Sequence, residues 1–244
     1  MCGRFTIFAN AGELGERFSV DVPAEYGPRY NVAPSQSVPV IGNDAPEAVQ
    51  FRTWGLLPSW ADDPSEYGFI NARAETIEDK PSFRSAVRRR RCLIPADGFY
   101  EWTGERGSRQ PYRIAFEDDR LFAMAGIWER WEGPVQQTGL DDFAGGGSGT
   151  GGATDAEGEP RTEVRETVAI LTTDSTGPVA DLHDRMPVIF PQEREREWLD
   201  ADDPEERADL LEPFESPEFD AYRVSTAVND PSNDSPDLVE PVSV

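Results

Sequence analysis

Side chains that carry chemistry are scarce in this chain of 244 residues, which has two cysteines, one histidine and one lysine. The cysteines, Cys2 and Cys92, are too few for a disulfide framework. Any imidazole chemistry has to come from His183. The sequence also lacks a basic-then-apolar leader and any run near the roughly 18 apolar residues that a membrane span needs. We therefore expect a cytoplasmic protein with no membrane partner.

Basic residues are strongly outnumbered, since 23 lysines and arginines stand against 47 aspartates and glutamates, giving a net charge of −24. A large acidic excess keeps a protein soluble where salt screens charge repulsion. We interpret the chain as a product of the salt-rich cytoplasm of a halophile; the alternative is an acidic protein that binds cations or basic partners. The acids are dispersed rather than clustered at metal-ligand spacing, which favours the first interpretation. We predict no metal and no cofactor.

The length favours one domain, which we place at residues 1–228. Apolar patterns predict strands at residues 5–8, 38–41, 48–54, 112–116, 121–131, 167–173 and 219–226. Helices are predicted at residues 82–90, 193–199 and 204–211, and from the N-cap Asn10 to Phe18. Gly126 suggests a bulge, and about residues 133–165 form a flexible Gly-rich insertion. The acidic, Pro-rich residues 229–244 predict a weakly ordered tail.

The start of the chain, from Met1 to Phe5, is the most informative stretch. An initiator Met before a small Cys side chain is normally trimmed, which would leave Cys2 with a free α-amine and a thiol. Their reference pKa values of about 7.7–8.0 and about 8.5 make both groups partly nucleophilic near neutral pH. Such a 1,2-aminothiol condenses with an aldehyde to an imine, and its thiolate then closes a thiazolidine ring. The alternative is a frayed terminus with a chance cysteine.

Three other stretches carry a functional and a structural interpretation side by side. Glu101 lies in an aromatic strand, on the face of Phe99, where an apolar setting raises a carboxyl pKa and suits acid–base work; it could also be an exposed glutamate. His183 lies in a polar turn before an apolar strand, as a catalyst or as a structural residue. The run 88–91, four arginines, is either a solvated helix end or a phosphate-contacting patch.

Taken together, six motifs in order resemble the SRAP family (SOS response-associated peptidase-like), whose members include abasic-site shielding proteins. The motifs cover residues 2 to about 226, and six in order with a nucleophile at the start is a specific signal. They are Met1-Cys2-Gly3-Arg4-Phe5, Asn31-Val32-Ala33-Pro34, Trp54-Gly55-Leu56-Leu57-Pro58, Asn71-Ala72-Arg73-Ala74-Glu75-Thr76, Gly98-Phe99-Tyr100-Glu101-Trp102 and His183-Asp184-Arg185-Met186-Pro187.

The resemblance implies an α+β fold with a curved, barrel-like mixed β-sheet and flanking helices. It also implies that the protein binds abasic sites in single-stranded DNA and forms a covalent thiazolidine crosslink through Cys2, with weak lyase activity and self-reversal. No cofactor is implied, and we expect a monomer that joins the nucleoid during DNA damage. Two departures stand out: the insertion is long, and the net charge opposes the phosphate neutralisation on which DNA affinity depends.

By the same resemblance, four residues carry the chemistry. Cys2 is the nucleophile, Asn71 positions the amine or the sugar, Glu101 moves protons, and His183 assists ring opening and reversal. Our hypothesis is that a local groove of arginines binds DNA within the acidic surface, formed by Arg4, Arg73, Arg84 and Arg185 with help from the run 88–91. Trp54 and Pro34 are expected to support a kink in the DNA beside the lesion. Cys92 is expected to be buried and structural.

Two other functions stay open. One is an N-terminal-nucleophile cysteine peptidase or hydrolase, in which Cys2 attacks an amide, including the autocatalytic removal of Met1. The other is a single-stranded DNA binder that uses arginines and aromatic rings alone, against which the net charge of −24 argues.

Overall fold

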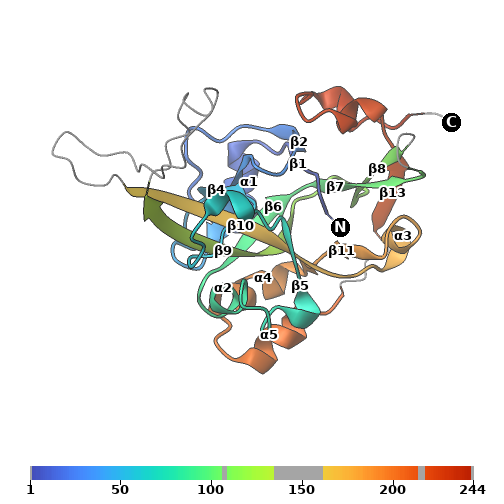
Figure 1. The fold of residues 1–244 in the computed structure, drawn as a ribbon. Helices are drawn as coiled ribbons and strands as arrows, with labels where there is room; N and C mark the ends of the chain where they lie inside the picture. Colours follow the sequence, from blue (N-terminus) through green and yellow to red (C-terminus); the bar gives the residue numbers. More distant parts are fainter. Residues whose placement is uncertain (1, 106–108, 135–161, 214–217, 243–244) are drawn as a thin grey trace, which may run out of the picture.

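Five strands close into a barrel because β10 pairs with β4 along one edge and with β9 along the other (Figure 1). The barrel strands are β3 (Ser37–Gly42), β4 (Gln50–Trp54), β6 (Arg91–Ala96), β9 (Phe122–Pro134) and β10 (Thr162–Asp174). The β4–β10 pair is parallel and the other four pairs are antiparallel. The mixed, barrel-like sheet expected from the family resemblance is therefore confirmed. This computed structural model describes residues 2–105, 109–134, 162–213 and 218–242.

Three short strands extend the barrel, and two of them carry residues predicted for the site. They are β5 (Asn71–Arg73), β11 (Arg185–Pro187) and β12 (Ile189–Phe190). Strand β5 runs parallel to β10, β11 runs antiparallel to β10, and β12 pairs with β9. Strand β10 can hold this central place because residues 167–173 are all buried, as their continuous apolar pattern predicted.

A second, antiparallel sheet of five strands has the order β13-β8-β7-β1-β2. These strands are β1 (Phe5–Ile7), β2 (Arg29–Val32), β7 (Gly98–Thr103), β8 (Gln110–Phe116) and β13 (Phe219–Arg223). The amino-terminal strand thus lies inside a sheet, paired with β7 on one side and β2 on the other. This pairing holds the start of the chain in place.

The helices are short and cover the barrel ends. They are α1 (Ala11–Phe18), α2 (Arg84–Arg89), α3 (Gly177–Ala180), α4 (Glu195–Asp200) and α5 (Pro204–Leu210). Helix α1 begins with the predicted N-cap: the Asn10 side chain accepts from two backbone N–H groups, and Glu13 reaches back to the Asn10 N–H. The 3₁₀ turns are η1 (Pro64–Glu66), η2 (Ala74–Thr76), η4 (Gln192–Arg194), η5 (Thr226–Asn229) and η6 (Pro236–Leu238). In Figure 1, α2, α4 and α5 gather at one end of the barrel. None of the helices within the described ranges is long and apolar enough to cross a membrane.

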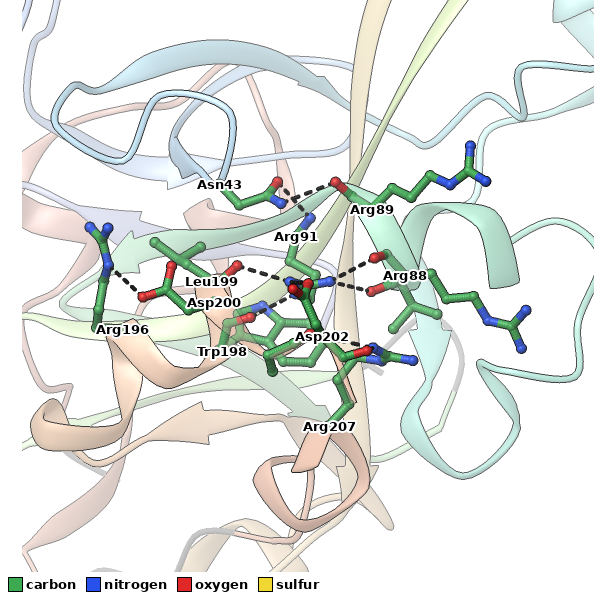
Figure 2. Close-up of polar contacts among 12 residues, drawn as sticks. Asn43, Arg88, Arg89, Arg91, Arg196, Trp198, Leu199, Asp200, Asp202 and Arg207 are labelled. Atoms are coloured by element: carbon green, nitrogen blue, oxygen red, sulfur yellow. Dashed lines mark hydrogen bonds and ion pairs between the residues drawn. The ribbon is translucent and has the colours of Figure 1, made fainter. Parts of the chain in front are cut away.

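Arg91 joins two of these helices, which Figure 2 shows in close-up. Its guanidinium is buried and donates to the carbonyls of Val87 and Arg88, at the end of α2, and of Trp198 and Leu199, in α4, at 2.7–3.1 Å. Helix C-termini leave such carbonyls unpaired, and an arginine satisfies several at once. The last arginine of the 88–91 run is therefore a structural residue inside the protein, and not part of a solvated or phosphate-contacting surface. Arg88 and Arg90, in the same run, form ion pairs with Glu78 and Glu129.

Gly126 does not form the bulge that the sequence suggested. It stays in regular register in β9, opposite Cys92 on one side and Ile170 on the other. A Cβ atom there would lie 2.7 Å from the Cys92 Sγ atom and 2.9 Å from Ile94. Glycine is needed because the buried Cys92 side chain occupies that space, which confirms the structural place expected for Cys92.

The carboxyl-terminal segment is not the weakly ordered tail that its composition suggested. Leu238 is 2% exposed, and the Asp234 carboxylate accepts from the backbone N–H groups of Tyr30 and Asn31 in β2. This segment therefore covers the edge strand of the second sheet, which explains why so polar a stretch is held. Of the predicted insertion, residues 135–161 lie outside the described residues, while its two ends continue β9 and β10 as a paired hairpin.

Candidate active site at the amino-terminal cysteine

Cys2 lies three residues before β1 and is completely buried. Strand β1 pairs with β7 through Phe5 and Phe99, and the Tyr100 N–H donates to the Arg4 carbonyl at 2.9 Å. Extending this antiparallel register brings the first residues of the chain alongside Glu101. Burial raises the pKa of the Cys2 thiol to about 12, and the negative charge of Glu101 contributes to the rise. The thiol therefore needs a proton acceptor before it can act as a nucleophile.

Asn71 is the first residue of β5, and it reaches Cys2 directly. Its side-chain Nδ2 donates a hydrogen bond of 2.8 Å to the Cys2 carbonyl oxygen. The Oδ1 atom of the same side chain is buried and accepts no hydrogen bond from the part of the chain that the structure describes. The amide thus fixes the backbone of Cys2 and keeps an acceptor atom for a donor that enters the site.

Glu101 points into the main core from β7. Phe99 belongs to the core cluster that contains Cys2, whereas Tyr100 and Trp102 belong to a separate cluster, as strand alternation predicted. Glu101 is 3% exposed, and burial raises its pKa to about 7, with the nearby Asp184 charge adding to the effect. A carboxyl group with this pKa exchanges protons near neutral pH, so it suits general acid–base work.

His183 follows α3 and precedes β11. Its Nδ1 atom accepts a hydrogen bond of 2.9 Å from the Arg185 backbone N–H. Burial lowers the pKa of His183, which favours the neutral ring at neutral pH. Because Nδ1 accepts, the proton of the neutral ring lies on Nε2, and the ring presents a donor to the site. The side chain is 32% exposed, so solvent and a ligand can reach it.

Cys2, Asn71 and Glu101 are therefore brought together by hydrogen bonding and charge, and His183 joins them through Asp184, whose charge acts on Glu101. Four residues far apart in sequence come from the segment before β1, from β5, from β7 and from the turn before β11. Together they bring a thiol, an amide, a carboxyl group and an imidazole to one region of the protein.

The six residues predicted to contact DNA differ in how far they are exposed. Arg73 and Arg84 are exposed and able to meet a ligand. Arg4 is half-buried, and its Nη1 donates to the Asn31 Oδ1 at 2.7 Å and to the Val228 carbonyl at 2.8 Å.

The other three candidates are also placed by the structure. The guanidinium of Arg185 donates hydrogen bonds to the carboxylates of Glu75 and Asp174. Trp54 is 1% exposed; it packs on Phe5 with ring centroids 5.3 Å apart, so it acts on a ligand only through that packing. Pro34 is half-buried in the loop after β2.

Sequence reasoning assigned no role to Asn31 and Glu75, although both stood in the quoted motifs. Asn31 is fully buried and its Nδ2 donates to the carbonyls of three residues of the carboxyl-terminal segment, Val228, Asp230 and Asn233. Glu75 binds Arg185. A single polar side chain in a short strand or a 3₁₀ turn has no periodic signal, so only the presence of Asn31 and Glu75 in a motif could have pointed to them.

A cavity of about 360 Å³ lies beside η2 and α5, lined by Glu75, Glu78, Asp174, Arg207 and Leu211 among others, and Cys2 is not part of its wall. Within the described ranges, no group of three or more His, Cys, Asp or Glu side chains is placed to hold a metal ion.

A family model described as SOS response associated peptidase (SRAP) matches residues 1–231. The chain belongs to the SRAP family. Relatives match this SRAP chain over nearly its whole length. It is 41% identical to abasic site processing protein YoqW of Bacillus subtilis, over 98% of this chain and 99% of the relative. It is 33% identical to abasic site processing protein HMCES of Gallus gallus, over 90% of this chain and 68% of the relative.

A solved structure supports the same SRAP assignment. A protein from Bacteroides thetaiotaomicron is 29% identical to the chain and superposes with a TM-score of 0.78, covering 99% of this chain and all of the other. The family expected from the six sequence motifs is therefore confirmed, and so is its fold.

Proposed function

We propose that this SRAP protein processes abasic sites in DNA by covalent capture through Cys2. One observation carries the proposal: Cys2 lies buried in the segment just before β1, with its carbonyl held by Asn71 and its thiol beside the carboxyl group of Glu101. The names of the relatives, both abasic site processing proteins, support the substrate. An abasic deoxyribose supplies the aldehyde with which an aminothiol reacts.

The proposed reaction has two bond-forming steps and no change of oxidation state. The α-amine of Cys2, free once Met1 is removed, adds to C1′ of the open-chain aldehyde and loses water to give an imine. The thiol then adds to the imine carbon, and its proton passes to the nitrogen, which closes the thiazolidine. An imine at C1′ also acidifies the C2′ protons, which accounts for weak strand cleavage by β-elimination.

Each of the other site residues has a role in these steps. Glu101 accepts a proton from the amine or thiol and returns one to the leaving hydroxyl, a task that suits its pKa of about 7. Asn71 holds the Cys2 backbone in position. His183, with its proton on Nε2, donates to the sugar oxygen during ring opening and to the adduct during reversal.

Single-stranded DNA would approach over the exposed arginines. Arg73 follows Asn71 in β5 by two residues, and Arg84 begins α2, so both are candidates to neutralise phosphates in an otherwise acidic protein. Arg4, Arg185, Trp54 and Pro34 complete the proposed DNA surface, the buried members acting by supporting it. We propose that the protein works as a monomer, in the cytoplasm and at the nucleoid.

We also propose that the protein removes its own Met1, which is the peptidase side of the site. The Cys2 thiol would attack the Met1 carbonyl carbon while Glu101 takes the thiol proton and passes it to the departing Cys2 nitrogen. Water would then hydrolyse the resulting Met1 thioester, which releases methionine and restores the thiol. Intact mass of the purified protein reports this step. Retention of Met1 in a Glu101→Gln variant but not in the wild type would support it, and retention in the wild type would contradict both this step and aldehyde capture.

The test of capture uses an oligonucleotide with one abasic site, incubated with the protein and run on a denaturing gel. We expect a slow, heat-stable band that is lost in Cys2→Ala and kept in Cys92→Ala, the matched control at the other buried cysteine. Cys2→Ser should give no stable band while a borohydride-trapped imine remains. A heat-stable band with Cys2→Ser would contradict ring closure, and no band with a trimmed wild type would contradict capture.

A further inference from the structure

Two groups compete for the Nδ1 atom of His183. The Arg185 backbone N–H donates to it at 2.9 Å, and the Asp184 Oδ1 lies 2.8 Å from it. The N–H contact requires an unprotonated Nδ1, whereas a hydrogen bond to the Asp184 carboxylate requires a proton there. The placement of the Arg185 amide therefore decides which nitrogen of the neutral ring carries the proton.

The Arg185 side chain fixes where that amide lies. Its Nη1 donates to the Glu75 Oε1 and the Asp174 Oδ1, both at 2.6 Å, and its Nη2 donates to the Glu75 Oε2 at 2.9 Å and the Thr172 carbonyl at 2.6 Å. The Arg185 side chain is 9% exposed. Strand β11 has only three residues, so its pairing with β10 alone is a short anchor. The bidentate ion pair between Arg185 and Glu75 adds a second, more rigid anchor.

The Arg185–Glu75 ion pair also connects the strands that carry the site residues. Glu75 lies in η2, directly after β5, which carries Asn71, while β10 contributes Thr172 and Asp174. Arg185 thus ties β5, β10 and β11 at one point. The same contact that orients His183 sets its distance from the residue that holds the Cys2 carbonyl.

We propose that Glu75 is a positioning residue that, through Arg185, keeps the proton of His183 on Nε2, facing the reacting sugar. The inference rests on the proposed function for its chemical meaning, because an Nε2 proton matters only where His183 acts as a donor. Other groups act on the ring as well. Asp184 raises its pKa, the terminal amine and Arg109 lower it, and Glu101 on β7 lies within the reach of the Asp184 charge.

The experiment uses the fact that His183 is the only histidine in the chain, so its ring gives one set of nitrogen resonances without assignment. We would record long-range ¹H–¹⁵N spectra of the full-length protein across the pH range of the neutral ring. The variants are Glu75→Gln and Glu75→Asp. The control is Glu163→Gln, which breaks another two-pronged pair, with Arg165, outside the site.

For the wild type and the control, we expect a protonated Nε2 and an unprotonated Nδ1. For Glu75→Gln, the Nδ1 resonance should move toward the value of a protonated nitrogen as Asp184 takes the proton, and Glu75→Asp should show a smaller shift in that direction. If only the pKa changes and the tautomer stays, Glu75 acts through its charge and the proposal is wrong. Should Glu75→Gln not fold, an unshifted Glu75→Asp spectrum overturns it equally.

A second readout separates this proposal from the proposed function. Reversal of the DNA crosslink by Glu75→Gln should slow by about tenfold, a part of the 10²–10⁴ that general acids contribute. The spectra need no DNA, so a tautomer shift with no crosslink in the wild type would leave the positioning role standing and remove the proposed function. A crosslink in the wild type with no tautomer shift in Glu75→Gln would leave the proposed function standing and remove the positioning role of Glu75.

Discussion

The side-chain amide of Asn71 donates a hydrogen bond of 2.8 Å to the backbone carbonyl of Cys2. A strand that pairs with β10 in the barrel therefore fixes a residue that leads into β1 of the second sheet. The nucleophile is held by its backbone, which leaves its amine and thiol free to react.

Asn71→Ala should slow the capture of an abasic site by roughly tenfold, because one hydrogen bond contributes about 0.5–1.5 kcal/mol and the vacated carbonyl is left unpaired. Single-turnover gel assays at saturating protein would measure the rate. Asn43→Ala is the matched control, since Asn43 also donates to a carbonyl, that of Arg89, but outside the site. Equal rates for the two variants would exclude a positioning role for Asn71.

Glu101→Gln should lower the rate of capture and remove the part of its pH dependence that Glu101 sets. Burial raises the pKa of Glu101 to about 7, so the carboxylate that accepts a proton forms only as the pH rises through that value. The wild-type rate should rise from about pH 7, whereas the variant's lower rate should rise only as the α-amine loses its proton, at about pH 7.7–8.0. Rates of crosslinking in a series of buffers measure this. A variant with the wild-type profile would transfer the base role to another group.

The same substitution should stabilise the fold in alkaline buffer. The folded state holds the Glu101 proton more tightly than the unfolded chain, whose glutamate pKa is about 4.3, so wild-type stability falls as the pH rises from about 4.3 to about 7. Gln does not ionise, so it carries no such penalty. At about pH 8, the free energy of unfolding of Glu101→Gln, measured with urea, should therefore exceed that of the wild type by roughly 1–3 kcal/mol. Lower stability than the wild type at that pH would contradict the raised pKa.

Arg73→Ala should weaken DNA binding at every sequence and lower the slope of log K against log salt by about 0.7, the value expected for one phosphate contact on a single strand. Arg73→Glu should weaken it further. The measurement uses DNA with a reduced abasic site, which cannot crosslink. Arg196→Ala is the control, because Arg196 is exposed on α4 and pairs with Asp200. An unchanged slope for Arg73→Ala would remove that residue from the DNA surface.

Gly126→Ala should destabilise the barrel by about 1–3 kcal/mol, the usual cost of overpacking a core. The new Cβ would lie 2.7 Å from the Cys92 Sγ. The double variant Cys92→Ala, Gly126→Ala should recover part of the loss, but not all, because Ile94 also crowds the site. Urea denaturation of the two single variants and the double variant measures the coupling. Additive losses would mean that Cys92 is not the obstacle.

Local patterns predicted the elements well, since α1 with its Asn10 cap, the buried part of β10 and the inward face of Glu101 all follow from rules within one segment. Closure of the barrel does not, because the parallel β4–β10 pair joins residues more than a hundred positions apart and leaves no local mark. The family motifs supplied that part of the fold.

The burial and the partners of polar residues were harder to predict from the sequence. The Arg88–Arg91 run looked uniform in sequence, yet Arg91 is buried under α4, because its neighbours in space come from a helix that composition could not place beside it. The acidic end of the chain looked unstructured because composition does not reveal that Leu238 is buried or that Asp234 binds the backbone of β2. Glu75 was visible in a motif, but its partner Arg185 lies 110 positions away.

The hydrogen bonds of Asn31 have a practical consequence for anyone who alters this protein. One buried amide connects Arg4, two residues after the nucleophile, to the carbonyls of residues 228, 230 and 233. Substitution of Arg4, or a truncation that removes residues 228–233, would therefore disturb the same few atoms. Reporter groups belong instead at Pro134 or Thr162, the exposed last residue of β9 and first residue of β10.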